Sequence, residues 1–134
     1  MPGAFASSNR INWYGFEKGA ALGEATGKKI FLHFYADWCA ACMKMAKETF
    51  KDESVVSYLN KNFIPIKVDA DREKQTASTY KVENLPATWF IAEKRQNIGF
   101  LTGYVSSDSL IKLLKYIHTE SYNRMSFKNF LERK

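Results

Sequence analysis

The feature that most restricts the fold of this chain is an abrupt change of pattern just before residue 39. Residues 30–36, Ile-Phe-Leu-His-Phe-Tyr-Ala, form a nearly continuous apolar run, which is typical of a strand buried on both faces of a sheet. The segment Trp38-Cys39-Ala40-Ala41-Cys42 follows and opens a helical pattern that reaches about residue 50. The change predicts a strand over 29–35 that leads through a short loop into a helix.

The chain has two cysteines, and both lie in this segment. Residues three apart share one face of a helix, so their sulfurs can close a disulfide. Cys39 would lie in the opening turn, where unpaired N–H groups and the helix dipole stabilise a thiolate. Cys42 would lie one turn later, less exposed, and could attack a mixed disulfide formed by Cys39. We predict Cys39 as the nucleophile of a thiol–disulfide exchange and Cys42 as the resolving thiol.

Other interpretations of the cysteine pair stay open at this point. A structural zinc site needs four ligands, and only His33 and His118 are available to join the two cysteines. Copper handling is a further alternative, because Cys and His suit soft metals. A purely structural disulfide would close a very small loop and constrain the unfolded chain little. We therefore predict an exchange enzyme without metal or cofactor, with a non-enzymatic module that binds a metal or a partner protein as the alternative.

Composition limits the remaining classes of protein. A length of 134 residues predicts one domain, and 46% hydrophobic residues suffice for a packed core. Residues 112–134 hold six Lys or Arg and two Asp or Glu, and so carry +4 of the net charge of +6. No groove-reading motif accompanies this basic segment, and no segment has the length of a membrane span. We expect a monomer that binds no nucleic acid and does not insert stably into membranes.

The pattern elsewhere predicts an α/β fold. Helices are expected over 14–26, 39–50, 55–59 and 72–80, and from Ser106 or Ser107 to about residue 117. Strands are expected over 29–35, 63–69, 87–91 and 98–102, the last two joined by a charged turn over 93–97. The early β-α-β units imply parallel pairing and the late hairpin antiparallel pairing, which gives a central mixed sheet flanked by helices. Cys39 then lies at the carboxyl end of a strand, where sites gather in such sheets.

The expected domain organisation has three parts. Residues 1–11 are predicted to be a flexible leader without the apolar core of a signal peptide, and residues 12–118 the main domain. Residues 119–134 are predicted to be a helical extension in which Ser126 caps a short helix. Its apolar and basic residues alternate. We expect the extension to pack against the domain, with binding of a partner or an anionic surface as the alternative.

With these motifs in place, the chain resembles the thioredoxin superfamily. Its Cys-x-x-Cys follows a strand and opens a helix, and Leu85-Pro86-Ala87-Thr88 precedes a later strand. The resemblance covers about residues 14–118 and implies the thioredoxin fold, with an N-terminal helix and a C-terminal helical extension. It also implies that Pro86 is cis and faces the cysteines. Trp38, Leu85, Pro86 and Ala87 would then line the substrate groove.

The details are most similar to the C-terminal domain of the bacterial thiol:disulfide interchange protein and to small secreted thioredoxin-like proteins. Two alanines stand between the cysteines, and Lys47 occupies the place of the proline that kinks the helix in thioredoxins. This resemblance implies a periplasmic electron carrier, with a cytoplasmic location as the alternative. The implied partners are protein disulfide substrates and a redox partner protein. Reduction or electron relay is favoured over disulfide formation, which an oxidase would carry out.

One departure from the family pattern concerns proton transfer. His33 stands where thioredoxins carry a buried aspartate, and Lys67 matches the lysine that accompanies it. Burial would favour the neutral imidazole, and a His–Lys pair has no attraction of the Asp–Lys kind. Two interpretations of His33 are open: an acceptor of the Cys42 proton, or a core histidine bonded to the backbone.

Overall fold

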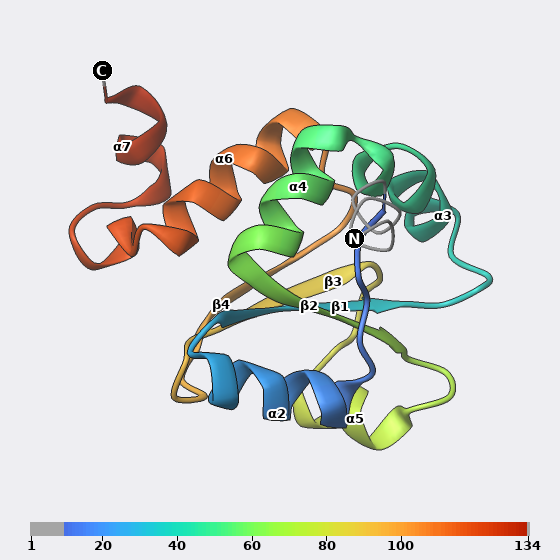
Figure 1. The fold of residues 1–134 in the computed structure, drawn as a ribbon. Coiled ribbons are helices and arrows are strands. Elements are labelled where there is room, and N and C mark those ends of the chain that lie inside the picture. The colour runs from blue at the N-terminus through green and yellow to red at the C-terminus, as the bar shows by residue number, and fades with distance from the viewer. Residues whose placement is uncertain (1–9, 134) are drawn as a thin grey trace, which may run out of the picture.

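The structure is a computed structural model, and it describes residues 10–133. The chain order alternates helices and strands: α2 (Phe16–Thr26), β1 (Lys29–Tyr35), α3 (Ala40–Lys47), a 3-10 turn (Thr49–Lys51), α4 (Glu53–Asn62), β2 (Phe63–Asp69), α5 (Lys74–Thr79), β3 (Ala87–Ile91), β4 (Asn97–Thr102), α6 (Ser107–His118), a second 3-10 turn (Ser121–Asn123) and α7 (Phe127–Glu132). Figure 1 shows this course from the N-terminal to the C-terminal end. The expected order of helices and strands is confirmed.

The four strands form one mixed sheet in the order β2-β1-β3-β4. Strand β1 pairs parallel with β2 and antiparallel with β3, and β3 pairs antiparallel with β4. The parallel pair comes from the early β-α-β unit and the antiparallel pair from the late hairpin, as the pattern predicts. Pro65 fits because β2 is an edge strand, where one missing backbone donor costs no ladder bond.

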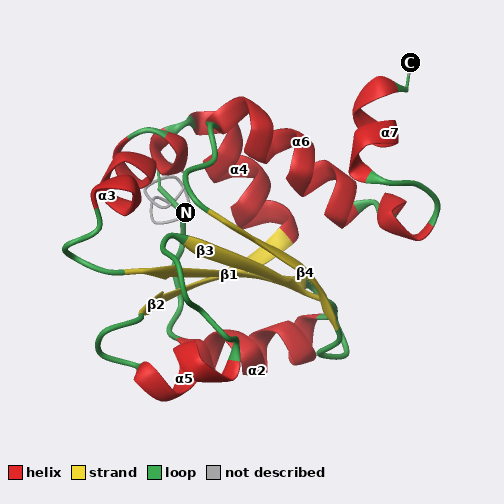
Figure 2. Cartoon of the chain, turned by 180° about the vertical axis from the view of Figure 1, so that it is seen from behind, coloured by secondary structure: helices red, strands yellow, loops and turns green. Residues whose placement is uncertain are grey.

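Helices cover both faces of the sheet. Helices α2 and α5 lie on one face, and α3, α4 and α6 lie on the other (Figures 1 and 2). Strand β1 therefore divides its side chains between two apolar cores: Leu32 belongs to the core on the α2 side, and Phe31 to the core on the α4 and α6 side. His33 follows Phe31 on the same face by the two-residue period of a strand. This places His33 under the layer that contains α3.

Helix α3 is shorter than the sequence predicts. The helical pattern extends to about residue 50, but α3 ends at Lys47 and the chain continues as a 3-10 turn. The reason is tertiary, because the buried hydroxyl of Thr49 donates a hydrogen bond to the carbonyl oxygen of Val105 at 2.5 Å, and the Tyr104 hydroxyl donates to Glu48 at 2.7 Å. The loop after β4 thus fixes the end of this helix.

Two other helix boundaries differ from the expected ones. Helix α4 begins two residues before the expected 55–59, because the Asp52 carboxylate caps it by accepting from the N–H groups of Ser54 and Val55, and it continues to Asn62. Helix α2 begins two residues late, because Tyr14 forms an isolated parallel bridge with Ile66 of β2. In both cases a polar or backbone contact decides the boundary that periodicity leaves open.

The C-terminal extension packs on α6. The Tyr116 ring lies 5.1 Å from the ring of Phe127 and 5.3 Å from that of Phe130, and its hydroxyl donates to the Met125 carbonyl oxygen at 2.7 Å. The Ser126 side chain caps α7, as the sequence predicts. Both views show α7 beside the C-terminal end of α6 (Figures 1 and 2).

The expected leader is described only at its end. Residues 1–9 lie outside the described residues, whereas Ile11 is buried in the core next to α4. The Asn60 side chain donates a hydrogen bond to the Arg10 carbonyl oxygen at 2.9 Å. Among residues 10–133, no helix is long and apolar enough to cross a membrane.

Candidate active site around Cys39 and Cys42

The cysteine pair lies where β1 ends and α3 begins. Cys39 is the N-cap residue of α3, and its Sγ accepts a hydrogen bond from the backbone N–H of Cys42 at 3.1 Å. Both residues are free thiols, 5% and 4% exposed. A sulfur at an N-cap occupies the position that side-chain oxygens usually take, among unpaired amide donors of the first turn. The geometry therefore places the Cys39 sulfur at the positive end of the α3 dipole.

The second thiol is held in its protonated form. Burial, and next the hydrogen bond with Cys39, raise the pKa of Cys42 to about 12. At neutral pH Cys42 consequently keeps its proton, and it must lose that proton before it can attack. The two thiols thus have different environments, which is the asymmetry that a nucleophile and a resolving thiol require.

Trp38 stands beside the cysteines as an exposed platform. Its side chain is 71% exposed, yet its indole N–H donates to the Asp71 carboxylate at 2.8 Å. Asp71 lies in the loop between β2 and α5. This hydrogen bond joins two loops at the same edge of the sheet and holds the indole in place without burying it. The sequence provides no local signal for Asp71.

The segment that precedes β3, which contains Leu85 and Pro86, lies beside the cysteines in space. The Leu85–Pro86 peptide bond is cis, and Leu85 packs against the small cluster formed by Ala36, Cys39 and Cys42. The Pro86 carbonyl oxygen accepts a hydrogen bond from the Gly103 N–H at 2.8 Å. Ala87 begins β3. The structure therefore brings Leu85 to the cysteine pair and places Pro86 and Ala87 directly after it in the chain.

His33 lies in the middle of β1 and is 2% exposed. Its Nδ1 lies 3.2 Å from the hydroxyl oxygen of Thr88, which is the residue opposite it on β3. The Phe50 ring meets the imidazole edge-on at 4.8 Å. The partner of His33 is thus a side-chain hydroxyl, rather than the backbone group considered from the sequence.

The imidazole is neutral in the folded protein. Burial, and to a lesser degree the nearby charge of Lys67, lower the pKa of His33 from 6.5 to about 3. A neutral imidazole can donate one hydrogen bond and accept another. It cannot hold an additional proton as a stable cation near neutral pH.

Lys67 lies opposite His33 on the parallel strand β2. Its ammonium group lies over two aromatic rings, 5.6 Å from the centroid of Trp13 and 5.3 Å from that of Tyr35. Such cation–π contacts hold a lysine without neutralising it. Lys67 therefore contributes a positive charge at the edge of the site.

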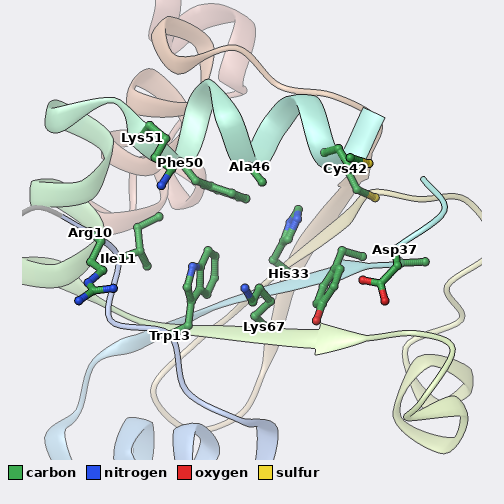
Figure 3. Close-up of a pocket in the computed structure, with 13 residues that line it drawn as sticks. Arg10, Ile11, Trp13, His33, Asp37, Cys42, Ala46, Phe50, Lys51 and Lys67 are labelled. Carbon is green, nitrogen blue, oxygen red and sulfur yellow. The ribbon is translucent and has the colours of Figure 1, made fainter. Parts of the chain in front are cut away.

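A cavity of about 450 Å³ lies on the Cys42 side of the site and is lined by His33, Lys67 and Cys42 among others (Figure 3). His33 points into it from β1 and Cys42 from α3. The full lining consists of Arg10, Ile11, Trp13, His33, Tyr35, Ala36, Asp37, Cys42, Met43, Ala46, Phe50, Lys51 and Lys67. Cys39, Trp38 and Leu85 do not line it, so the two cysteines open toward different surroundings.

Several of these residues escape sequence reasoning. Thr88, Trp13 and Phe50 form the surroundings of His33, but each looks like an ordinary core residue in the sequence. Thr88 faces His33 only through the register of β1 and β3, which joins residues 55 positions apart. A prediction of that register would have found it, because residues opposite each other share one face. Among residues 10–133, no three His, Cys, Asp or Glu side chains gather closely enough to hold a metal ion.

A Cys-x-x-Cys between a strand and a helix, in a four-stranded mixed sheet covered on both faces, is the arrangement of thioredoxin-fold domains. A family model for the thioredoxin-like domain matches residues 17–118. The chain belongs to this family.

Individual relatives agree with this class. The chain is 41% identical over 103 residues to the thiol:disulfide interchange protein DsbD of Vibrio vulnificus, an alignment that covers 72% of this chain and 17% of that protein. It is 30% identical over 96 residues to a thioredoxin of Mycoplasmoides gallisepticum, covering 68% of this chain and 86% of that one. The chain spans from 33% to 54% of the length of three further relatives. It matches part of each of those proteins.

A solved structure supports the fold directly. The solution structure of a thioredoxin from Thermus thermophilus aligns with a TM-score of 0.74 and 24% identity, covering 81% of this chain and 87% of that one. This likeness concerns the fold.

Proposed function

We propose that the protein is a thiol–disulfide oxidoreductase that reduces protein disulfides, or relays electrons to them, through Cys39 and Cys42. The observation that carries the proposal is the position of Cys39 as the N-cap of α3, with its sulfur accepting the Cys42 N–H at 3.1 Å. Membership of the thioredoxin-like family and the likeness to a thiol:disulfide interchange protein support it.

The proposed reaction has two exchange steps. The Cys39 thiolate attacks one sulfur of a substrate disulfide, whose S–S bond breaks, and the released thiolate takes a proton from water. Cys42 then loses its proton and attacks Cys39 Sγ, which breaks the mixed disulfide and releases the second substrate thiol. Two electrons pass to the substrate, and Cys39 and Cys42 end as a disulfide. A redox partner protein restores the dithiol.

The proton of Cys42 leaves through the cavity in this proposal. Since the pKa of Cys42 is about 12 and that of His33 about 3, the imidazole is a weak acceptor for the Cys42 proton. We propose that His33 and Lys67 line the path along which this proton leaves, and that water is its final acceptor. The check is the pH profile of the resolving step in His33→Ala, and an unchanged profile would remove His33 from the route.

The substrate groove in this proposal lies on the Cys39 side. Trp38 offers an exposed indole held by Asp71, and Leu85 contacts the cysteine cluster. Pro86 and Ala87 continue the same segment into β3. An extended peptide that carries the disulfide would lie against these residues, as the family resemblance implies.

Location and assembly are further parts of the proposal. The likeness to DsbD supports a periplasmic protein, and we propose a monomer that works with protein partners. Cell fractionation tests the location, and molecular mass in solution tests the monomer.

The exchange activity is tested with insulin as a model disulfide substrate. We expect reduction by the unaltered chain, no reduction and no covalent adduct with Cys39→Ser, and an accumulated mixed disulfide with Cys42→Ser. Stoichiometric metal binding without any exchange would instead support a binding module.

The direction of electron flow is tested by the redox potential measured against glutathione. A potential near the roughly −270 mV of thioredoxin supports a reductase, and one near roughly −120 mV supports a disulfide-forming oxidase.

A further inference from the structure

The cavity beside Cys42 contains a polar atom that the protein leaves unused. His33 is 2% exposed and points into this cavity (Figure 3). Within residues 10–133, Thr88 is the single hydrogen-bond partner of the imidazole, and it engages Nδ1. The other ring nitrogen, Nε2, has no protein partner in that part of the chain. Every fully buried side-chain nitrogen or oxygen atom of residues 10–133 has a hydrogen-bond partner, so Nε2 is open to the cavity, where water or a ligand can pair with it.

Thr88 decides which ring nitrogen carries the proton. Thr88 is 2% exposed, and its hydroxyl bonds to no group other than His33 in the described part of the chain. If the Thr88 hydroxyl donates to Nδ1, the hydroxyl proton has an acceptor. If Nδ1–H donates to the hydroxyl oxygen instead, the hydroxyl proton is buried without an acceptor, which costs free energy. We assign the proton to Nε2 on this argument. His33 therefore presents an N–H donor to the cavity.

The charge of the lining favours an anion. Arg10, Lys51 and Lys67 line the cavity, and none of these three forms an ion pair with any residue in the range 10–133. Asp37 is the one carboxylate in the lining. With His33 neutral, three cations face a single anion.

The walls favour an apolar body. Trp13, Phe50 and Met43 contribute aromatic and aliphatic surface, and Ile11 and Ala46 complete it. The volume of about 450 Å³ lies within the usual range of small-molecule pockets, about 300–1,000 Å³. An apolar pocket with a few convergent polar groups is the usual form of such a site.

We propose that this cavity binds a small organic anion with an aromatic body, an aromatic carboxylate, whose charge lies at His33 Nε2–H and Lys67 and whose ring lies against Trp13 and Phe50. The site is separate from the proposed substrate groove, because neither Cys39 nor Trp38 lines it. A bound ligand would contact the resolving thiol Cys42 and leave the nucleophile free.

The test is a titration of the reduced full chain followed by nitrogen-15 NMR, with benzoate as the probe. Benzamide, which has nearly the same shape and no charge, is the matched control ligand. We expect saturable binding of benzoate with shifts at His33 and Trp13, and about tenfold weaker binding of benzamide, because bonds to charged groups are the stronger ones. We also expect bound benzoate to raise the pKa of His33 from about 3, since the carboxylate stabilises the imidazolium.

Variants locate the site. Lys67→Met should weaken benzoate binding about fivefold or more and leave benzamide binding unchanged, and Lys51→Met should act in the same direction. Lys128→Met removes an exposed cation on α7, outside the lining, and should have no effect. Equal affinity for benzoate and benzamide, no saturable binding of benzoate, or an equal effect of Lys128→Met would each overturn the proposal.

This result is separable from the proposed function. The titration uses no disulfide exchange, and Cys39→Ser, which removes the exchange, is expected to bind benzoate as the unaltered chain does. If Cys39→Ser lost benzoate binding while the unaltered chain kept it, the placement of the site on the Cys42 side would be wrong.

Discussion

At the scale of single residues, the site depends on two buried titratable groups with opposite tendencies. Burial raises the pKa of Cys42 to about 12 and lowers that of His33 to about 3, because in each case it disfavours the charged form. Both groups are therefore uncharged at neutral pH. The lysine opposite His33, Lys67, supplies a positive charge beside them.

His33 makes the stability of the protein sensitive to acid. Between pH 6.5 and about 3, the unfolded chain binds a proton at His33 that the folded chain does not, so the free energy of unfolding falls as the pH drops through this window. At about 1.4 kcal/mol per pH unit, the loss reaches at most about 5 kcal/mol. We expect His33→Gln to flatten this part of the stability–pH curve in urea unfolding.

The control for this prediction is His118→Gln, which removes an exposed histidine. It should leave the steep part of the curve in place. An equally steep curve in His33→Gln would show that carboxyl groups, rather than His33, cause the acid sensitivity.

At the scale of elements, close approaches and caps hold the layers in position. A Cβ atom added at Gly19 of α2 would clash with the Ile66 side chain of β2. Glycine is needed here because α2 approaches β2, the edge strand of the sheet, too closely for a larger residue. The Asp52 cap performs a similar task for α4, because it fixes where the helix begins.

Gly19→Ala should destabilise the protein. Overpacking costs about 1–3 kcal/mol, and the better helix propensity of alanine returns up to about 1 kcal/mol, so we expect a net loss of about 1–2 kcal/mol in the free energy of unfolding. Gly99→Ala on β4 is the control, since nothing lies within 4 Å of the Cβ position there. A higher melting temperature for Gly19→Ala would contradict the close packing of α2.

Asp52→Ala should lower the free energy of unfolding by about 1 kcal/mol, because the N–H groups of Ser54 and Val55 lose their acceptor. Asp52→Asn keeps an acceptor oxygen and should recover most of the loss. Denaturant unfolding of the two variants, compared at the same pH, measures the difference. Equal stability of the alanine and asparagine variants would show that the cap contributes nothing.

At the scale of the whole molecule, the C-terminal extension is joined to the domain by apolar and ionic contacts. Phe130 is 8% exposed and packs on Tyr116 of α6. The buried Lys29, at the start of β1, binds Glu93 at 3.2 Å and Glu120 at 2.8 Å. One lysine thus joins the first strand, the β3–β4 hairpin and the beginning of the extension.

Phe130→Ala should lower the free energy of unfolding by about 3 kcal/mol, because it removes a buried ring and leaves a cavity. Leu131→Ala, at the neighbouring position of α7 and 48% exposed, should change it by less than about 0.5 kcal/mol. Melting temperatures of the two variants give the comparison. Similar small effects would mean that α7 does not contribute to the stability of the domain.

The sequence predicted the elements well where the pattern was local. The strand over 29–35, the hairpin and the Ser126 cap depend on periodicity and turn chemistry within a few residues. The predicted end of the helix that begins after Cys39 was wrong because it depends on Val105 and Tyr104, which come from a distant loop. The proposed site residues Cys39 and Cys42 came from spacing, whereas the domain boundaries remain a prediction.

The sequence by itself determined the order of elements and the position of the cysteines at the end of a strand, because apolar periodicity and three-residue spacing act over short distances along the chain. Only the tertiary structure decided what surrounds Cys42. The Thr88 partner of His33, the low pKa of that histidine and the cavity between β1 and α3 all arise from strand register and layer packing. These bring together residues 55 positions apart, and no local pattern encodes that distance.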